Sequence, residues 1–335
     1  MSICFAFDNE HSQDGAGAQV FRIIGVFCLA RHYKIGFVNR DILTLDSNPG
    51  DNMDSHQKEL ELIADLGKFL NLDSYSCKLH HEEKVLPDHL FFRLQIFFLM
   101  WLRFRQLLNL VKGTHEVYTV QNPYKLTLKK PNVYKYFRDT RPLQNNKKLH
   151  DKFDVQLHIR RAYVSNSRFQ NRFSPTEWYR EILSPITTLL KANHIPYEIT
   201  VHTDVSHPNA DWKPSFSTAT SDYFKNNDVK FNEDSTISLG YEDFSETLGD
   251  LGNINVVTGI SVLEAWEMMQ HADLLIIGKS TFSFVPGLLN QRGTIISPVG
   301  FLEGPRTWTF LNEPPKMTTM LVKTILDKWT GSSNK

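Results

Sequence analysis

Short apolar runs alternate with helical patterns through the second half of the chain, and this alternation constrains the fold more than any other feature. We predict strands over residues 155–159, 197–202 and 274–277, with helices over 175–192, 260–271 and 282–290. Strands that alternate with helices form a mostly parallel sheet. The carboxyl ends of such strands lie along one edge, so the residues that follow them are expected to lie close together.

The first forty residues repeat the pattern, with a strand at 3–7, a helix from about 18 to 33 and a strand at 35–39. The stretch 121–150 is polar and basic, as is typical of a linker. We therefore predict two α/β domains, residues 1–145 and residues 146–335. The first carries a helical insertion at about 55–111, and the last helix of the chain is a candidate to cross back to it.

Charge and cysteine content exclude some classes of function. The chain has 37 basic and 37 acidic residues among 335, so a dominant nucleic-acid-binding role is disfavoured and no nucleic-acid partner is expected. Three cysteines are too few for a disulfide framework and fit a reducing compartment. The N-terminus lacks the basic start and apolar core of a signal peptide, so a cytoplasmic location is expected.

The stretch 90–111 is the most apolar part of the chain. Its run of large apolar residues is interrupted by Arg93, Gln95, Arg103, Arg105 and Gln106, and charges are costly in a lipid core. We interpret it as a helix packed between domains. The alternative is a helix that lies on a membrane surface as a peripheral contact, with its arginines at the headgroups.

The predicted strand 155–159 delivers His158, Arg160 and Arg161 to one spot. Arginine is rarely buried without a partner, and its guanidinium matches a diphosphate geometrically. The cluster therefore indicates a phosphorylated ligand. Structural salt bridges are the alternative explanation.

A second polar group follows the predicted strand 274–277. Ser280, Thr281, Phe282 and Ser283 open a helix, where hydroxyls and backbone N–H groups form an anion site. Ordinary helix capping is the alternative. Asp204 follows the predicted strand 197–202, where it could bind a ribose, organise an arginine or start a turn.

A glycine-containing loop precedes the first helix. Asp14, Gly15, Gly17 and Gln19 resemble part of a dinucleotide fingerprint, but the third glycine is missing and no Walker lysine follows. Small residues here allow a ligand to approach the backbone, although a tight turn needs the same residues. On this loop alone, a nucleotide-binding oxidoreductase is an alternative function.

These motifs, taken in order, resemble the alpha-1,2-, alpha-1,6- and protein O-fucosyltransferase superfamily. The glycine loop with Gln19, the His-Ile-Arg-Arg run at 158–161, a strand ending in Thr-Asp, and the Gly-Lys-Ser-Thr-Phe-Ser run at 278–283 span residues 14–290 in the family's order. The resemblance implies a GT-B glycosyltransferase, in which two Rossmann-like domains with mostly parallel sheets face a cleft. It also implies inverting chemistry without metal or cofactor, GDP-fucose as donor and a glycan as acceptor.

The resemblance assigns roles to matching residues. Arg160 would hold the donor diphosphate in the second, nucleotide-sugar-binding domain, and His158 and Arg161 would shape that pocket. Phosphate or sugar contacts would come from Ser280, Thr281, Phe282 and Ser283. The first domain would bind the acceptor and border the cleft with Gly15, Gly17 and Gln19.

Two positions depart from the family pattern. Ala162 and Tyr163 follow Arg161 where the family has Gly-Asp, and Ala265, with Glu264 beside it, stands about where a guanine-reading aspartate would be. Glu264 is thus our candidate for the base-reading acid. Another donor, such as UDP-xylose or another GDP-sugar, stays open, as does an inactive module that binds a glycan or a nucleotide sugar.

An inverting transfer needs a group that accepts the proton of the acceptor hydroxyl. Our choice is Asp14, with Asp8, His11 and His158 as alternatives. The chain contains no Asp-x-Asp run and no His/Cys set with zinc spacing, so no metal site is predicted.

Overall fold

Two parallel sheets organise the chain in the computed structural model, which describes residues 2–9, 15–45, 55–77, 82–86, 95–121, 123, 127, 131–141, 151–160, 174–203 and 243–333. The chain divides into a first unit, Met1–Pro142 with Glu303–Arg306, and a second unit, Leu143–Leu302 with Thr307–Lys335. The predicted α/β class is confirmed, because every strand pair described in either sheet is parallel. The predicted boundary at residues 145–146 lies outside the described residues.

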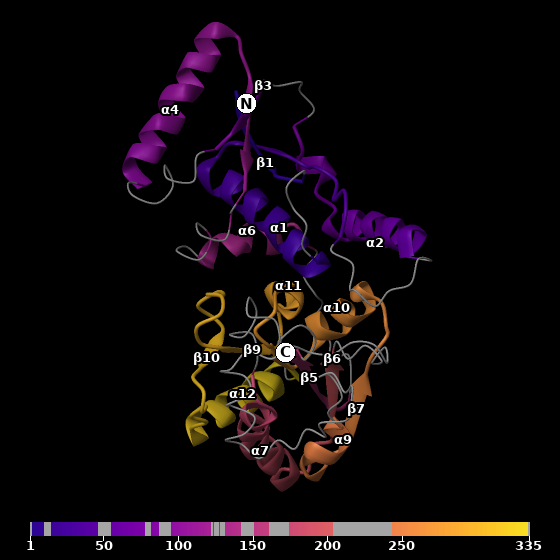
Figure 1. Cartoon of the computed structure of the whole chain (residues 1–335). Helices are drawn as coiled ribbons and strands as arrows, with labels where there is room; N and C mark the ends of the chain where they lie inside the picture. The colour runs from indigo at the N-terminus through magenta and orange to yellow at the C-terminus, as the bar shows by residue number, and fades with distance from the viewer. Residues whose placement is uncertain are drawn as a thin grey trace, which may run out of the picture. The chain divides into compact units, whose positions relative to one another are not determined.

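The first unit is built on a four-stranded sheet of order β2-β1-β4-β3 (Figure 1). Its strands are β1 (Ile3–Phe7), β2 (Gly36–Val38), β3 (Glu82–Val85) and β4 (Glu116–Val120). Its helices are α1 (Ala16–Tyr33), α2 (Ser55–Leu70), α4 (Gln95–Lys112) and α6 (Lys135–Arg138), with short 3-10 turns at Asp73–Tyr75 and Pro131–Tyr134.

Helix α1 forms the centre of this unit because its sequence is apolar nearly all round, as expected of a fully buried helix. Val20, Ile24 and Phe27 have no exposed surface, and Phe27 packs edge-on against Phe37 of β2. The helix ends at Tyr33, and the capping residue Lys34 adopts the left-handed conformation with φ 56° and closes the last turn through its backbone N–H.

Helix α4 is fixed to the first sheet by a buried carboxylate at the start of β4. Glu116 accepts hydrogen bonds from Lys84 (2.5 Å), Asn109 (2.8 Å) and Tyr118 (3.0 Å), and it also pairs with Arg105. Burial alone would raise the pKa of Glu116, but these donors outweigh it and hold the pKa at about 2. The inner side of α4 is therefore held to the sheet by an ion pair and hydrogen bonds to Glu116.

The second unit contains a six-stranded sheet of order β10-β9-β8-β5-β6-β7. Its strands are β5 (Phe153–Ile159), β6 (Tyr197–Thr203), β7 (Ile254–Val257), β8 (Leu274–Ile276), β9 (Thr294–Pro298) and β10 (Thr309–Leu311). Its helices are α7 (Thr176–Ala192), α9 (Phe244–Thr247), α10 (Val262–His271), α11 (Thr281–Leu289) and α12 (Thr319–Ser333), with a 3-10 turn at Gly249–Leu251.

Apolar and polar side chains alternate along strand β5 and so lie on opposite faces of the second sheet. Phe153, Val155, Leu157 and Ile159 join one apolar core with residues of α7 and α12. Because successive side chains point to opposite faces, the residues between them lie on the other face of the sheet. That face carries the polar series Asp154, Gln156, His158 and Arg160.

Several expectations about elements need correction. The insertion predicted as helical also adds a strand, β3, whose four residues Glu82–Val85 are too short and charged to show an apolar alternation. The last helix packs in the core of the second unit, where Trp329 meets Phe153 edge-on at 5.6 Å. The helix predicted from residue 175 begins one residue later, because Pro175 takes the capping position without a side-chain bond, and the preceding Ser174 donates to Glu313 at 2.9 Å.

No helix in the part of the chain that the structure describes has both the length and the apolarity needed to cross a bilayer.

Candidate functional site

The order of strands in the second sheet reverses between β5 and β8. From β5 the chain proceeds outward through β6 and β7, and then returns to the other side of β5 to add β8, β9 and β10. In open parallel sheets, ligands bind beyond the carboxyl ends of the strands at such a switch point. The residues that follow β5 and β8 therefore occupy the position where this fold binds ligands.

Arg160 and Ser280 meet at this switch point. Arg160 directly follows β5, and its Nη1 donates to Ser280 Oγ at 3.3 Å, although 120 residues separate them in the sequence. The predicted juxtaposition of the arginine and the hydroxyl run is thus present. A guanidinium and a hydroxyl at one strand edge offer several N–H and O–H donors to an anion.

Ser280 is also the N-cap of α11, and this fixes its side chain. Its hydroxyl accepts from the backbone N–H of Phe282 at 3.3 Å, while Ser283 Oγ donates to the Ser280 carbonyl at 3.3 Å. The first turn of a helix carries partial positive charge and N–H groups without intrahelical partners. Arg160 and the start of α11 therefore place positive potential on the same point.

Gly278 allows this arrangement because β5 and the loop after β8 approach very closely. A Cβ at this position would lie 2.7 Å from the His158 carbonyl oxygen and 3.1 Å from the Tyr179 hydroxyl. Tyr179 itself donates to the same carbonyl at 3.1 Å. A glycine is therefore needed here for the close approach, and its position directly after an apolar strand is the sequence signal of that contact.

His158 is buried beneath the site, with 3% of its surface exposed. Its ring lies 5.2 Å from that of Phe282, which in turn lies 5.9 Å from that of Trp266. Burial, together with the charge of Arg160 and the neighbouring His202, lowers the pKa of His158 to about 3. A ring of such low basicity is a poor proton acceptor at neutral pH, which disfavours His158 as the general base.

A polar ladder continues from His158 along the same face of the sheet. His202, directly opposite His158 on β6, shares a hydrogen bond of 2.6 Å between its Nε2 and Gln156 Oε1, and Gln156 Nε2 donates to Asp154 at 2.7 Å. Burial lowers the pKa of His202 to about 4. Both histidines are therefore neutral in the folded protein near pH 7.

Because both histidines are buried and neutral, we expect the second unit to become less stable as the pH falls. Each has a folded-state pKa well below the unfolded value of 6.5, so the unfolded chain binds more protons as the pH falls from about 6.5 toward 3. The contribution of these histidines to the free energy of unfolding is fully present above the unfolded pKa and is lost as the pH falls through this window. For His158 the loss is about 2 kcal/mol between pH 7.5 and 5. Denaturant unfolding at a series of pH values measures the effect.

The variant His158→Asn should flatten that slope, whatever its stability at pH 7.5. The matched control is His194→Gln, because His194 is an exposed residue after α7. If wild type and His158→Asn lose stability in parallel as the pH falls, then His158 does not carry the effect.

Lys279 does not add to the anion site. Its Nζ lies 2.8 Å from Glu313 Oε1, the carboxylate that also accepts from Ser174. The lysine and Ser280 therefore contact different partners, although they are adjacent in the sequence. The Glu313 contact joins residues far apart in the sequence, and no local pattern could have revealed it.

The glycine loop takes a different form from the one expected. Helix α1 begins at Ala16, so Gly17 lies inside the helix, and Gly15 is the N-cap, where a Cβ would have nothing within 4 Å of it. Gln19 has no exposed surface, and its amide donates to the Thr44 carbonyl. Gln19 therefore supports the packing of the first unit, and the predicted donor contacts of Gly15 and Gly17 stay predictions.

Glu264 also serves its own helix. Its carboxylate accepts from Ser261 N at 2.9 Å, while Ser261 Oγ accepts from Glu264 N at 3.2 Å. This reciprocal capping box could have been recognised from the Ser-x-x-Glu spacing. Capping accounts for the carboxylate locally, whereas base recognition by Glu264 stays a prediction.

Several predicted site residues lie outside the described residues. They are Arg161 and Asp204, which were assigned to the donor, and Asp14 and His11, which were proposed as the base. Asp8 is described, and it follows β1 with 5% of its surface exposed. Within the described ranges, no three His, Cys, Asp or Glu side chains gather closely enough to hold a metal ion.

Comparison with known proteins gives only distant matches. No protein-family model and no curated protein matches the chain. Among solved structures, E. coli heptosyltransferase WaaC with ADP is 9% identical with a TM-score of 0.35, over 99% of this chain and 100% of that one. POFUT1 in complex with GDP-fucose is 10% identical with a TM-score of 0.37, over 92% and 96%. Such scores carry no functional argument, so function must be argued from the residues.

Proposed function

We propose that this chain is an inverting, metal-independent glycosyltransferase that uses a nucleotide-sugar donor, with GDP-fucose the first donor to test and a glycan hydroxyl as acceptor. The observation that carries the proposal is the bond between Arg160 and Ser280 at the point where the strand order of the second sheet reverses. It combines a permanent cation, a hydroxyl and a helix N-terminus where α/β sheets bind ligands.

This set of groups suits a diphosphate leaving group. In an inverting transfer the acceptor oxygen bonds to the anomeric carbon as the bond from that carbon to the phosphate oxygen breaks. The bonding electrons leave with the nucleoside diphosphate, whose charge then increases. Arg160 and the first turn of α11 would stabilise that charge without a metal, since preorganised donors lower the barrier where charge develops.

The proton of the acceptor hydroxyl must pass to a base. Asp14 remains our choice, and Asp8 is the alternative whose position is described, at the carboxyl end of β1. His158 fits a positioning role better, because its ring packs on Phe282 at the start of α11. In that role it would hold the first turn of the helix in place for the phosphates.

A thermal-shift panel tests the donor. Full-length protein is heated with GDP, UDP, ADP and GDP-fucose, each in excess. We expect GDP and GDP-fucose to raise the midpoint of unfolding by several degrees, because a ligand at about 100 times its Kd stabilises the folded state by roughly 2.7 kcal/mol. Selective stabilisation by UDP or ADP would correct the base while keeping the diphosphate site, and no stabilisation by any of them would overturn the proposal.

Turnover separates an enzyme from a module that only binds. The motivation for the second candidate is the absence of an acid after Arg161, where Ala162 and Tyr163 stand. Incubation with the stabilising donor should release free sugar slowly in the absence of acceptor. Binding of the donor without any release would favour the inactive module.

A further inference from the structure

Helix α4 presents large apolar side chains on both its inner and its outer side. On the inner side, Phe98 and Leu102 are buried, and Trp101 packs on Tyr118 of β4 at 5.3 Å. On the outer side, the exposed residues include Met100, Phe104, Leu107, Leu110 and Val111, each between 59% and 77% exposed. Positions 100, 104, 107 and 111 follow the helical period, so they form one stripe.

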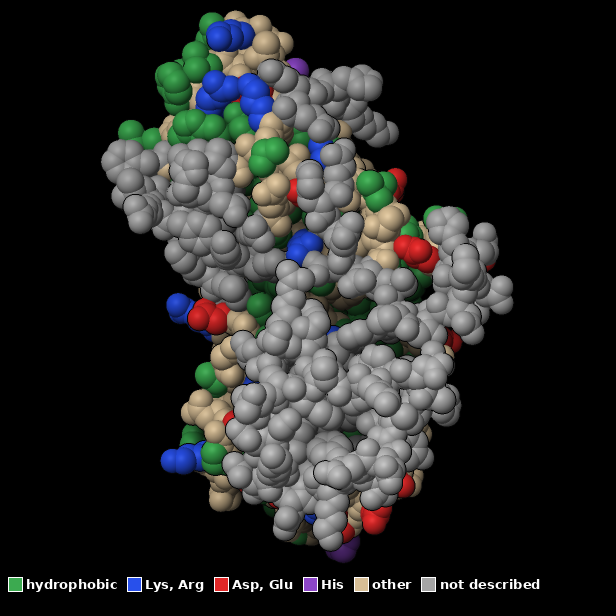
Figure 2. Space-filling view, in the orientation of Figure 1, with side chains coloured by type: hydrophobic (Ala, Val, Ile, Leu, Met, Phe, Trp, Pro, Cys, Tyr) green, Lys and Arg blue, Asp and Glu red, His purple; other side chains and the backbone are tan. Residues whose placement is uncertain are grey.

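Charge along α4 is entirely positive. Gln95–Lys112 contains Arg103, Arg105 and Lys112 and no acidic residue. Arg105 is turned inward to Glu116, Arg103 is exposed beside the apolar stripe, and Lys112 is exposed at the C-terminal end of the helix. Figure 2 shows this side of the first unit, with hydrophobic and basic side chains lying together over α4.

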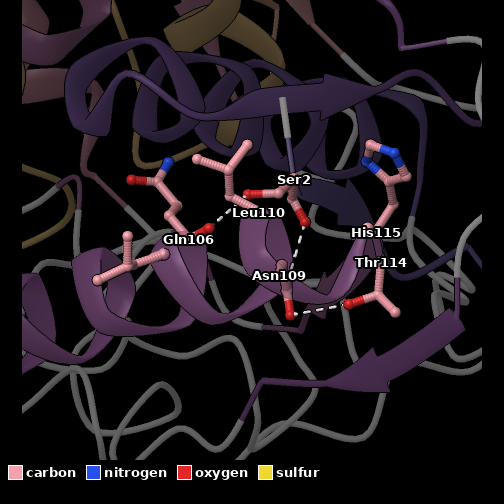
Figure 3. A pocket seen from close by; sticks show the side chains of 8 residues that line it. Ser2, Gln106, Asn109, Leu110, Thr114 and His115 are labelled. Carbon is pink, nitrogen blue, oxygen red and sulfur yellow. Dashed lines mark hydrogen bonds between the residues drawn. The ribbon is translucent and has the colours of Figure 1, made fainter.

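A pocket opens at the C-terminal end of the stripe. It has a volume of about 490 Å³, and Leu107 and Leu110 line it together with Ser2 and residues 113–115 (Figure 3). Its polar groups bond to one another: Ser2 Oγ donates to the Gln106 carbonyl at 3.1 Å, and Asn109 Nδ2 donates to the Ser2 carbonyl at 3.2 Å. With those groups paired, the side chains of Leu107 and Leu110 favour an apolar occupant.

We propose that the outer face of α4, defined by Met100, Phe104, Leu107, Leu110 and Val111, docks the protein onto an anionic lipid surface, with Arg103 beside this face and Lys112 at the end of the helix as the basic contacts. An amphipathic helix binds a membrane interface by burying apolar side chains while its basic residues meet anionic headgroups. The pocket beside Leu110 gives the apolar part of a lipid a place next to that face. This inference concerns the first unit and does not depend on the proposed donor.

Vesicle sedimentation of the full chain tests the docking face. Vesicles of phosphatidylcholine alone are compared with vesicles in which about a third of the lipid is phosphatidylglycerol. We expect binding to the anionic vesicles that weakens at high salt. Phe104→Glu should reduce that binding at least roughly tenfold, and Arg103→Ala or Lys112→Ala roughly fivefold each.

Two control variants keep the test interpretable. Leu60→Glu places the same charge at an exposed leucine of α2 and should bind as wild type does. Phe104→Leu keeps the apolar surface and should also bind, which separates loss of the face from loss of the fold. Wild type that ignores anionic vesicles overturns the proposal. A second result would also overturn it: the wild type is a dimer in solution, Phe104→Glu is a monomer, and neither protein binds vesicles. The outer face of α4 would then join two copies of the chain.

Discussion

Replacing Arg160 by alanine should reduce affinity for the nucleoside diphosphate by at least roughly a hundredfold and reduce transfer to a similar degree. The guanidinium supplies a permanent positive charge at the switch point, where Ser280 and the first turn of α11 add hydroxyls and backbone N–H groups. Arg160 lies at the end of β5 and contributes no apolar side chain to the core, so the variant should fold. Calorimetric titration with the stabilising nucleotide measures the loss.

Arg160→Lys distinguishes charge from geometry. Lysine restores a point charge but not the planar fork that matches two phosphate oxygens, so we expect an intermediate affinity. Arg180→Ala is the matched control, because Arg180 lies on α7 and forms an ion pair with Asp250 at 2.8 Å, away from the switch point. Wild-type affinity in Arg160→Ala would remove the proposed phosphate site.

Gly278→Ala should destabilise the second unit by about 1–3 kcal/mol and also weaken nucleotide binding. The added Cβ would lie 2.7 Å from the His158 carbonyl oxygen, which belongs to a central strand and cannot move alone. The loop after β8 would shift instead, and with it Ser280 and the start of α11. Urea unfolding and nucleotide titration of the same preparation give both effects.

Two further variants assign the cause of that effect. Gly249→Ala should be close to neutral, because nothing lies within 4 Å of a Cβ at that position. The double variant Tyr179→Phe/Gly278→Ala removes the hydroxyl that would lie 3.1 Å away but leaves the nearer backbone oxygen in place. We therefore expect no rescue, and full recovery in the double variant would mean that the tyrosine contact alone constrains the site.

Much of the second unit could be predicted from local patterns. The strands predicted at 155–159 and 274–277 correspond to β5, which begins two residues earlier at Phe153, and to β8, and the hydroxyl run at 280–283 lies at the start of α11. These features depend on neighbours in the sequence and on the periods of strands and helices, which hold in nearly any context. Strands β3, β7 and β10 were missed, because they are short strands at the edges of the sheets and their sequences show no clear apolar run or alternation.

The local environment of individual site residues depends on tertiary packing as well as on sequence motifs. Gln19 and Glu264 were assigned to a ligand on motif position, yet Gln19 is buried against Thr44 and Glu264 caps its own helix. The Ser-x-x-Glu box was visible in the sequence, but the burial of Gln19 depends on a loop that arrives 25 residues later. Burial is a property of the packed chain and cannot be read from one motif.

The sequence by itself determined the parallel α/β class and placed an arginine and a hydroxyl run at strand ends, because strand and helix periods and the chemistry of anions are local. The tertiary structure decided that β8 lies beside β5, which brings Arg160 to 3.3 Å from Ser280 at the reversal of strand order. It also decided that His158 is buried and neutral, since desolvation arises only when β6 and α11 bring His202 and Phe282 next to the ring. Strand order and burial are set by packing between distant segments, and the sequence pattern of any one segment does not contain them.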